Sequence, residues 1–291
     1  MGFNSWEQTG GLALFSNPNI LHNWDFRNSS TIVNQRGQTM YSTDNSIYSI
    51  DRWLVSRGSL EIRQGYVRLT RLVDTIETNF IQHLEFSQIH YGATVTLSIQ
   101  TTEGLFSATG IVPLSNGVNG ITLQLGSSPF VFVLRRQWNG GISIFVADFS
   151  GVGATGDYLD IQAVKLEYGT VSTLANDPPM NFGRELAICQ RYQVVLNIQR
   201  FRLRASWVQA NNIGFYLPLT TPLRIRPSIT NSSNLRVMSL SLGGMPAFTF
   251  ATMNDSSNEL GVILMATLSG HGMSDAVLDV MTGNVILDAN L

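Results

Sequence analysis

Cysteine is nearly missing from this chain, which has one, Cys189, in 291 residues. A single cysteine excludes a disulfide framework within the chain and a zinc site built on cysteines. The residues just before it are apolar, which favours a buried, unreactive thiol over a nucleophile. The four histidines lack the spacing of metal ligands; they are His22, His83, His90 and His271.

Charged residues are also scarce, at 13% of the chain, where soluble domains typically have about 25%. The formal net charge of −2 gives no general attraction to nucleic acid or to an anionic membrane. The longest apolar stretches, such as 130–134 and 142–147, are far shorter than the ~20 residues that cross a bilayer, so we expect no membrane insertion. The first 19 residues lack the pattern of a signal peptide, and we expect synthesis in the cytoplasm.

Short stretches of alternating apolar and polar residues recur along the chain. Two of them predict β-hairpins, because residues 59–63 and 66–73 flank Gln64-Gly65, and residues 130–134 and 142–149 flank Asn139-Gly140, which is a strong turn signal. No long amphipathic pattern separates these stretches. The sequence therefore predicts an all-β protein of the sandwich or jelly-roll type.

The length of the chain and a proline-containing interruption within it predict two β-sandwich domains. Pro178-Pro179 interrupts regular structure, and the stretch from Arg184 to Tyr192 favours a short helix before strands resume. We expect an N-terminal arm over 1–16, a jelly roll over 17–175, a linker with a short helix over 176–192 and a second β-domain over 193–291.

Binding of a sugar requires exposed aromatic rings together with amide or guanidinium donors. Trp24 and Trp53 lie between apolar strand residues, so we expect them in the core. Trp138 differs, because it precedes the Asn139-Gly140 turn and follows two arginines. The candidate glycan-binding residues are Trp138, Arg135, Arg136, Tyr66 and Tyr91.

Charge is segregated in the second half of the chain. Residues 186–254 include seven arginines and no acid, whereas residues 255–291 include five acids and no base. One interpretation is that the acidic strands pair with these arginines, within a subunit or across a subunit interface. The other is a site for an anionic glycan or a teichoic acid, since guanidinium groups match carboxylate and phosphate. The candidates are Arg200, Arg202, Arg204, Arg224 and Arg226.

Several segments, taken in order, resemble one family. The runs NPNILHNWDF (17–26), VNQRGQ (33–38) and YSIDRW (48–53), followed by YLDIQAVKLEYGTVST (158–173) and ELAICQRYQ (185–193), resemble tail-fibre and receptor-binding proteins of phages and prophages. The closing GNVILDANL is a weaker match. The first half of such proteins is similar to a jelly-roll carbohydrate-binding module.

The resemblance implies a virion protein, a homotrimer, that attaches without covalent chemistry to a host cell-surface polysaccharide. We expect the N-terminal arm to contact other virion proteins. In jelly-roll modules of this kind a structural calcium often ties the first strand to the last, which makes Asp25 and Asp160 candidate ligands; no other cofactor is expected.

Two alternatives remain open at this stage. One is a purely structural virion component, such as a head fibre or a baseplate part, without receptor binding. The other is a polysaccharide depolymerase, which needs two carboxylates facing each other across a cleft; no spacing in the sequence identifies such a pair. We expect the protein not to be an enzyme.

Overall fold

The structure is a computed structural model. It describes residues 16–74, 77–85, 87–126, 128–147, 153–197, 202–209, 212–225, 227–230, 235–239, 249–253, 261–267, 276–280 and 284–289. Strands dominate these residues, and α1 (Phe182–Gln190) is the one α-helix among them. The prediction of an all-β protein is confirmed. The N-terminal arm predicted over 1–16 lies outside the described residues except for Ser16.

The first unit, residues 16–177, forms one large antiparallel sheet. Its strand order is β6-β5-β10-β3-β2-β4-β9-β8-β7, with β1 paired to β2. Both predicted hairpins are confirmed, because β2 pairs with β3 and β8 pairs with β9. The strands are β1 (Met40–Tyr48), β2 (Leu54–Arg63), β3 (Tyr66–Arg71), β4 (Asn79–Leu84), β5 (Thr94–Thr101), β6 (Gly104–Ile111), β7 (Asn119–Gln124), β8 (Val131–Arg136), β9 (Ile142–Ala147) and β10 (Tyr158–Tyr168).

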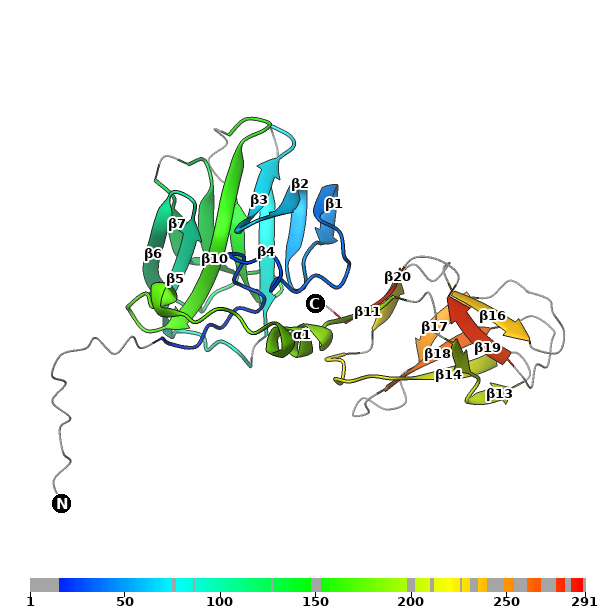
Figure 1. Ribbon diagram of the computed structural model, residues 1–291. Coiled ribbons are helices and arrows are strands. Elements are labelled where there is room, and N and C mark those ends of the chain that lie inside the picture. The colour runs from blue at the N-terminus through cyan, green and yellow to red at the C-terminus, as the bar shows by residue number, and fades with distance from the viewer. Residues whose placement is uncertain are drawn as a thin grey trace, which may run out of the picture.

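The sheet curls until its two end strands, β6 and β7, meet (Figure 1). Glycines make this approach possible. A Cβ at Gly110 would collide with the carbonyl oxygen of Gly120, and a Cβ at Gly120 would collide with the carbonyl oxygen of Ile111. The curled sheet encloses one hydrophobic core.

Aromatic rings stack at the centre of this core. The rings of Trp53 and Phe80 stack with their centroids 4.4 Å apart, and Phe26 meets Trp53 edge-on at 6.0 Å. Trp53 is fully buried and Trp24 is nearly so. Both predictions of core tryptophans are therefore confirmed.

The second unit, residues 193–289, has a separate hydrophobic core, which includes Ile213, Phe215, Leu264 and Leu287. Its strands form three small antiparallel sheets, in the orders β11-β20-β15, β12-β19-β16 and β13-β14-β18-β17. The strands are β11 (Gln193–Asn197), β12 (Arg202–Arg204), β13 (Trp207–Gln209), β14 (Asn212–Pro218), β15 (Ser228–Thr230), β16 (Leu235–Ser239), β17 (Thr249–Met253), β18 (Gly261–Thr267), β19 (Ala276–Val280) and β20 (Asn284–Asp288).

The segment between the two units has a 3-10 turn, η1 (Leu174–Asn176), and then α1. Helix α1 begins at Phe182 because the side chain of Asn181 accepts a hydrogen bond from the backbone N–H of Arg184, at 3.0 Å, as an N-cap does. The negative charge of Glu185 in the first turn interacts favourably with the positive end of the helix dipole. The predicted short helix is confirmed and begins two residues early. Figure 1 shows α1 between the two units.

In the part of the chain that the structure describes, no helix has both the length and the apolarity to cross a membrane.

Candidate functional site

The turn between β8 and β9 is held by three hydrogen bonds. The N–H of Gln137 donates to the carbonyl of Gly141 at 2.6 Å, and the N–H of Gly140 donates to the carbonyl of Gln137 at 3.0 Å. The side chain of Asn139 accepts from the N–H of Gly141 at 3.1 Å. Gly140 has a φ of +91°, a conformation that favours glycine. This turn therefore presents its residues on a fixed backbone.

Trp138 is the most exposed large hydrophobic residue in the described chain, at 76%. Its ring lies against Gly117, where a Cβ would come within 2.7 Å of two ring carbons. The amide of Asn116 donates to the carbonyl of Trp138 at 3.0 Å. The indole is thus positioned by its neighbours although most of its surface faces water.

Arg136 and Tyr91 lie beside the same turn. The guanidinium carbon of Arg136 is 4.2 Å from the centroid of the Tyr91 ring, within cation–π range. The hydroxyl of Tyr91 donates to the carbonyl of Gly140 at 2.8 Å, and Arg136 donates to the carbonyl of Leu114. We call Tyr91, Leu114, Arg136 and Trp138 the hairpin platform. Three of the five candidate glycan-binding residues belong to it.

The other two candidates lie apart from the platform. Arg135 pairs across β8–β9 with Ser143, and adjacent strand residues point to opposite faces, so it faces away from Arg136. Tyr66 is at the start of β3, which is separated from β8 by β2, β4 and β9 in the sheet. Its neighbour Arg68 has its guanidinium carbon 3.9 Å from the Tyr158 ring centroid.

The two aspartates predicted to bind calcium each face an arginine. Asp25 accepts two hydrogen bonds from Arg27, at 2.7 and 2.9 Å. Asp160 accepts two from Arg68, each at 2.7 Å. The described residues include no group of three or more His, Cys, Asp or Glu that could hold a metal ion. Backbone bonding ties the first segment to the last strand, through an Asp25–Ala163 bridge. Calcium binding stays a prediction, and an ion would have to displace an arginine.

The arginines of the second unit are only partly described. Arg200 and Arg226 lie outside the described residues, and Arg204 is exposed at the end of β12. The backbone register places Arg202 opposite Asp279. Arg224 forms an ion pair with Glu85 of the first unit, with Nε 2.8 Å from Oε1. This arginine therefore joins the two units of one chain.

Several segments that carry the family resemblance meet in a buried polar network. Asn23, fully buried with a φ of +49°, donates from its side chain to the carbonyls of Val33 and Asp51, at 2.8 and 2.9 Å. Its side-chain oxygen accepts from the N–H of Val33. Its own N–H donates to Glu185 of α1 at 2.9 Å. A single asparagine thus connects the first segment, the β1–β2 region and the helix.

Asp51 and Arg52 extend this network to the second unit. Asp51 accepts from the side chain of Gln193 at 3.1 Å and from the N–H of Gln35 at 2.9 Å. Burial raises the pKa of Asp51 to about 7. The guanidinium carbon of Arg52 lies 3.5 Å from the centroid of the Tyr192 ring. The segments YSIDRW and ELAICQRYQ therefore hold α1 and β11 against the first unit.

A second buried cluster fastens the linker. Lys165 of β10 is fully buried, and its Nζ donates to Thr173 at 2.8 Å, to Ser16 at 3.0 Å and to Asp177 at 2.5 Å. Glu167, also fully buried, accepts from the N–H and the hydroxyl of Thr173, at 2.8 and 2.5 Å. Sequence reasoning missed this cluster. The signal was a lysine and a glutamate two positions apart in the apolar second half of β10.

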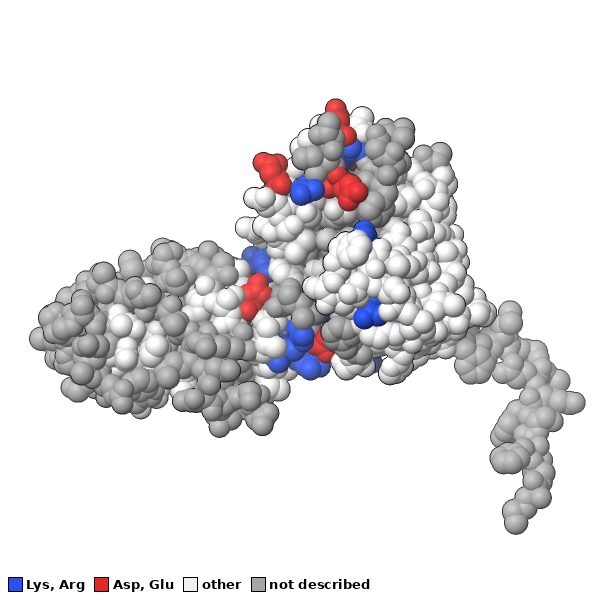
Figure 2. Space-filling view, turned by 180° about the vertical axis from the view of Figure 1, so that it is seen from behind, with Lys and Arg blue, Asp and Glu red and all other residues white. Residues whose placement is uncertain are grey.

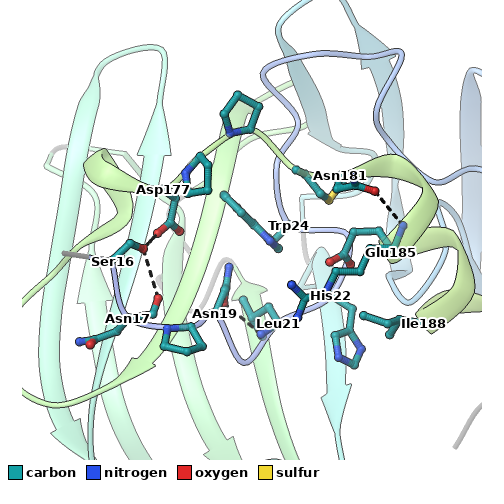
Figure 3. Close-up of a pocket in the computed structure, with 15 residues that line it drawn as sticks. Ser16, Asn17, Asn19, Leu21, His22, Trp24, Asp177, Asn181, Glu185 and Ile188 are labelled. Carbon is teal, nitrogen blue, oxygen red and sulfur yellow. Dashed lines mark hydrogen bonds between the residues drawn. The ribbon is translucent and has the colours of Figure 1, made fainter. Parts of the chain in front are cut away.

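A hollow of about 560 Å³ lies between the first segment, the linker and α1 (Figure 3). Trp24, His22, Asp177 and Glu185 are among the residues that line it. Their charges are engaged within the chain, since Asp177 pairs with Lys165 and Glu185 accepts from Asn23. Burial lowers the pKa of His22 to about 3, so its imidazole is neutral. This hollow therefore lies among the contacts that hold the linker and α1 against the first unit.

Cys189 of α1 is fully buried, as predicted. Burial raises the pKa of its thiol, so the sulfur stays protonated and is a poor nucleophile.

Comparison of the chain with protein-family models, with curated proteins and with solved structures finds no match. The candidate site accordingly stands on its own geometry, in which the hairpin platform is the best-defined exposed feature.

Proposed function

We propose that this protein attaches non-covalently to a cell-surface glycan, and that the hairpin platform makes the contact. The observation that carries the proposal is the Trp138 side chain, which is 76% exposed yet positioned by Gly117 and Asn116. An exposed indole offers a large, rigid face for the apolar CH groups of a sugar ring. A fixed ring also loses little side-chain entropy on binding.

Polar groups stand beside the ring. Asn116 and Asn139 are both exposed. The amide of Asn116 donates to the carbonyl of Trp138, and the side-chain oxygen of Asn139 accepts from the N–H of Gly141. Arg136 stacks on the Tyr91 ring, and this contact fixes the position of its guanidinium group. Such amide and guanidinium groups supply the directional hydrogen bonds that sugar hydroxyls need.

The surface favours a ligand with little charge. Only 13% of the chain is charged. Figure 2 shows the Lys, Arg, Asp and Glu residues gathered mainly at one end of the first unit and at its junction with the second, with mostly neutral described surface between. A neutral polysaccharide is therefore a better partner for this unit than a polyanion.

The wider setting rests on the sequence resemblance. We place the protein on a phage-like virion as a homotrimer of two β-sandwich domains, joined to other virion proteins by its N-terminal arm. Three weak sites on one trimer, and several trimers on one particle, would multiply a weak affinity through effective concentration. This arrangement suits a shallow platform that has no deep pocket.

A glycan array tests the proposal. The wild-type protein should bind a subset of bacterial polysaccharides, and Trp138→Ala should lose most of that binding. The matched control is Tyr158→Ala, which removes another exposed aromatic ring, 54% exposed, from a different part of the sheet. Failure of the wild-type protein to bind any host polysaccharide would favour a purely structural virion component. Release of new reducing ends from a bound polysaccharide would show a depolymerase.

A further inference from the structure

The hairpin that carries Trp138 also forms one wall of a small pocket, through residues other than Trp138. This pocket has a volume of about 180 Å³ and lies between the end of β4, the β8–β9 turn and Arg224 of the second unit. Gln137, Asn139 and Gly141 of the turn line it, and Trp138 does not. The pocket is therefore distinct from the hairpin platform, although the two share a rigid turn.

Charges in the pocket compensate one another. Glu85 and Arg224 form an ion pair, with 2.8 Å between Oε1 and Nε. His83 is neutral, because burial and the charge of Arg52 lower its pKa. Its Nδ1 is 2.7 Å from the hydroxyl of Ser143. The pocket thus presents a neutral lining to a ligand.

Three side-chain atoms of the lining have no hydrogen-bond partner within the described residues: Nη1 of Arg224, Oε1 of Glu85, which instead takes part in the ion pair with Nε of Arg224, and Nε2 of Gln137. The Nε2 of Gln137 is buried and forms no hydrogen bond within the described residues. A buried amide without a partner is destabilising, and a ligand hydroxyl that reaches it would supply the missing acceptor. Apolar contacts come from Leu84 and Ile142, both in the lining and nearly fully buried. Apolar walls with a few directed polar groups are typical of sites for small ligands.

The size of the pocket matches one ring. An apolar cavity of roughly 150 Å³ in another protein takes up benzene, so about 180 Å³ admits a six-membered ring. We propose that this pocket binds one neutral pyranose residue, with Gln137 donating to a ring hydroxyl and Leu84 and Ile142 contacting its apolar edge. Because Arg224 belongs to the second unit, the bound sugar would lie against both units of the chain.

Titration with free monosaccharides tests this proposal. Saturation-transfer NMR on the full chain with glucose, galactose, mannose, rhamnose and N-acetylglucosamine should show that at least one binds saturably. The dissociation constant should be millimolar, as expected for a ligand of about a dozen non-hydrogen atoms. Absence of saturable binding by any of the five sugars would overturn the proposal.

Two variants locate the site. Gly141→Leu should fill the pocket and weaken binding by at least about tenfold, a loss of roughly 1.4 kcal/mol. It should fold, since Gly141 does not have a positive φ and a Cβ there meets only Asn139, at 3.4 Å. Gln137→Ala should weaken binding by about fivefold. It removes the amide that would donate to the sugar, and one such hydrogen bond typically contributes ~1 kcal/mol.

The matched control is Gly183→Leu, which adds the same side chain at a remote glycine that also has open space around it. This control should bind as the wild type does, and the melting temperatures of all variants should be compared. Trp138→Ala should retain monosaccharide binding. Sugars that are lost with Trp138→Ala but retained with Gly141→Leu would place binding on the platform instead and refute the pocket. Unchanged glycan-array binding by Trp138→Ala, together with monosaccharide binding that is lost in Gly141→Leu, would refute the platform alone.

Discussion

Removal of the Lys165 charge is the sharpest test of how the linker is fastened. Lys165→Met keeps the length of the side chain and deletes its ammonium group. The variant leaves Asp177, whose side chain is 4% exposed, and Glu167, which is fully buried, without their cation. Breaking a buried ion pair by removing one partner typically costs about 3 to 5 kcal/mol. We expect the free energy of unfolding to fall by that amount.

Urea denaturation followed by near-ultraviolet circular dichroism measures this loss. The matched control is Arg63→Met, because Arg63 pairs with Glu61 at 2.7 Å but both side chains are more than a third exposed, at 38% and 39%. An exposed pair contributes at most about 1 kcal/mol. The double variant Lys165→Met with Asp177→Asn should recover part of the stability, since it removes one uncompensated charge. Equal losses for Lys165→Met and Arg63→Met would refute the reasoning.

Three further predictions follow from buried contacts. Burial raises the pKa of Asp51 from 3.8 to about 7, so between these values the folded protein holds a proton that the unfolded chain has lost, and stability falls as the pH rises until it levels off near pH 7. Asp51→Asn should remove this slope, which amounts to at most about 4 kcal/mol, and an unchanged pH profile of the melting temperature would contradict the burial argument. Gly110→Ala should destabilise the first unit by about 1 to 3 kcal/mol through overpacking against Gly120, whereas Gly183→Ala should not, as thermal melts of the two variants would show. Arg224→Met should weaken the contact between the two units, seen as a greater separation of their calorimetric transitions than in the wild type, and an unchanged separation would argue against a coupling role.

Much of the strand content follows from local alternation. The strands β3 and β7 bury alternate residues, as their sequences predict. In β5 the polar Thr96 and Ser98 are buried together with their apolar neighbours, which the alternation does not predict. The strand β6 was not predicted, because Gly104–Ile111 alternates half-buried and exposed residues and includes two glycines and a serine. The strand β4 was not predicted, because Gln82, which is fully buried, interrupts its apolar pattern. Its side chain exchanges hydrogen bonds with the backbone of His22, 60 residues away.

The candidate site shows the same division between local and distant information. The exposure of Trp138 followed from its place beside the Asn139-Gly140 turn. The stacking of Arg136 on Tyr91 could not be predicted, because it joins the end of β8 to the loop before β5. Tyr66 was grouped with Trp138 by its position beside a turn, and the structure places it near Arg68 and Tyr158 instead. Turn proximity predicts exposure but carries no information on which turns lie together.

The buried polar network was the largest omission. Asp51 and Gln193 are 142 positions apart, and no local pattern connects them. The segments that carry the resemblance had been interpreted as marks of a family, and in the structure several of them hold the linker and α1 against the first unit. Their residues therefore explain how the two units are joined, and the hairpin that we propose for ligand contact lies outside those segments.

The most direct test of the central claim is a calorimetric titration of a glycan-array ligand into wild-type protein and Trp138→Ala. The hairpin-platform proposal predicts at least a tenfold weaker affinity for the variant, from the loss of roughly 1.4 kcal/mol of ring contact, with a melting temperature close to that of the wild type. Equal affinities at equal stability would show that Trp138 does not contact the glycan and would contradict the account.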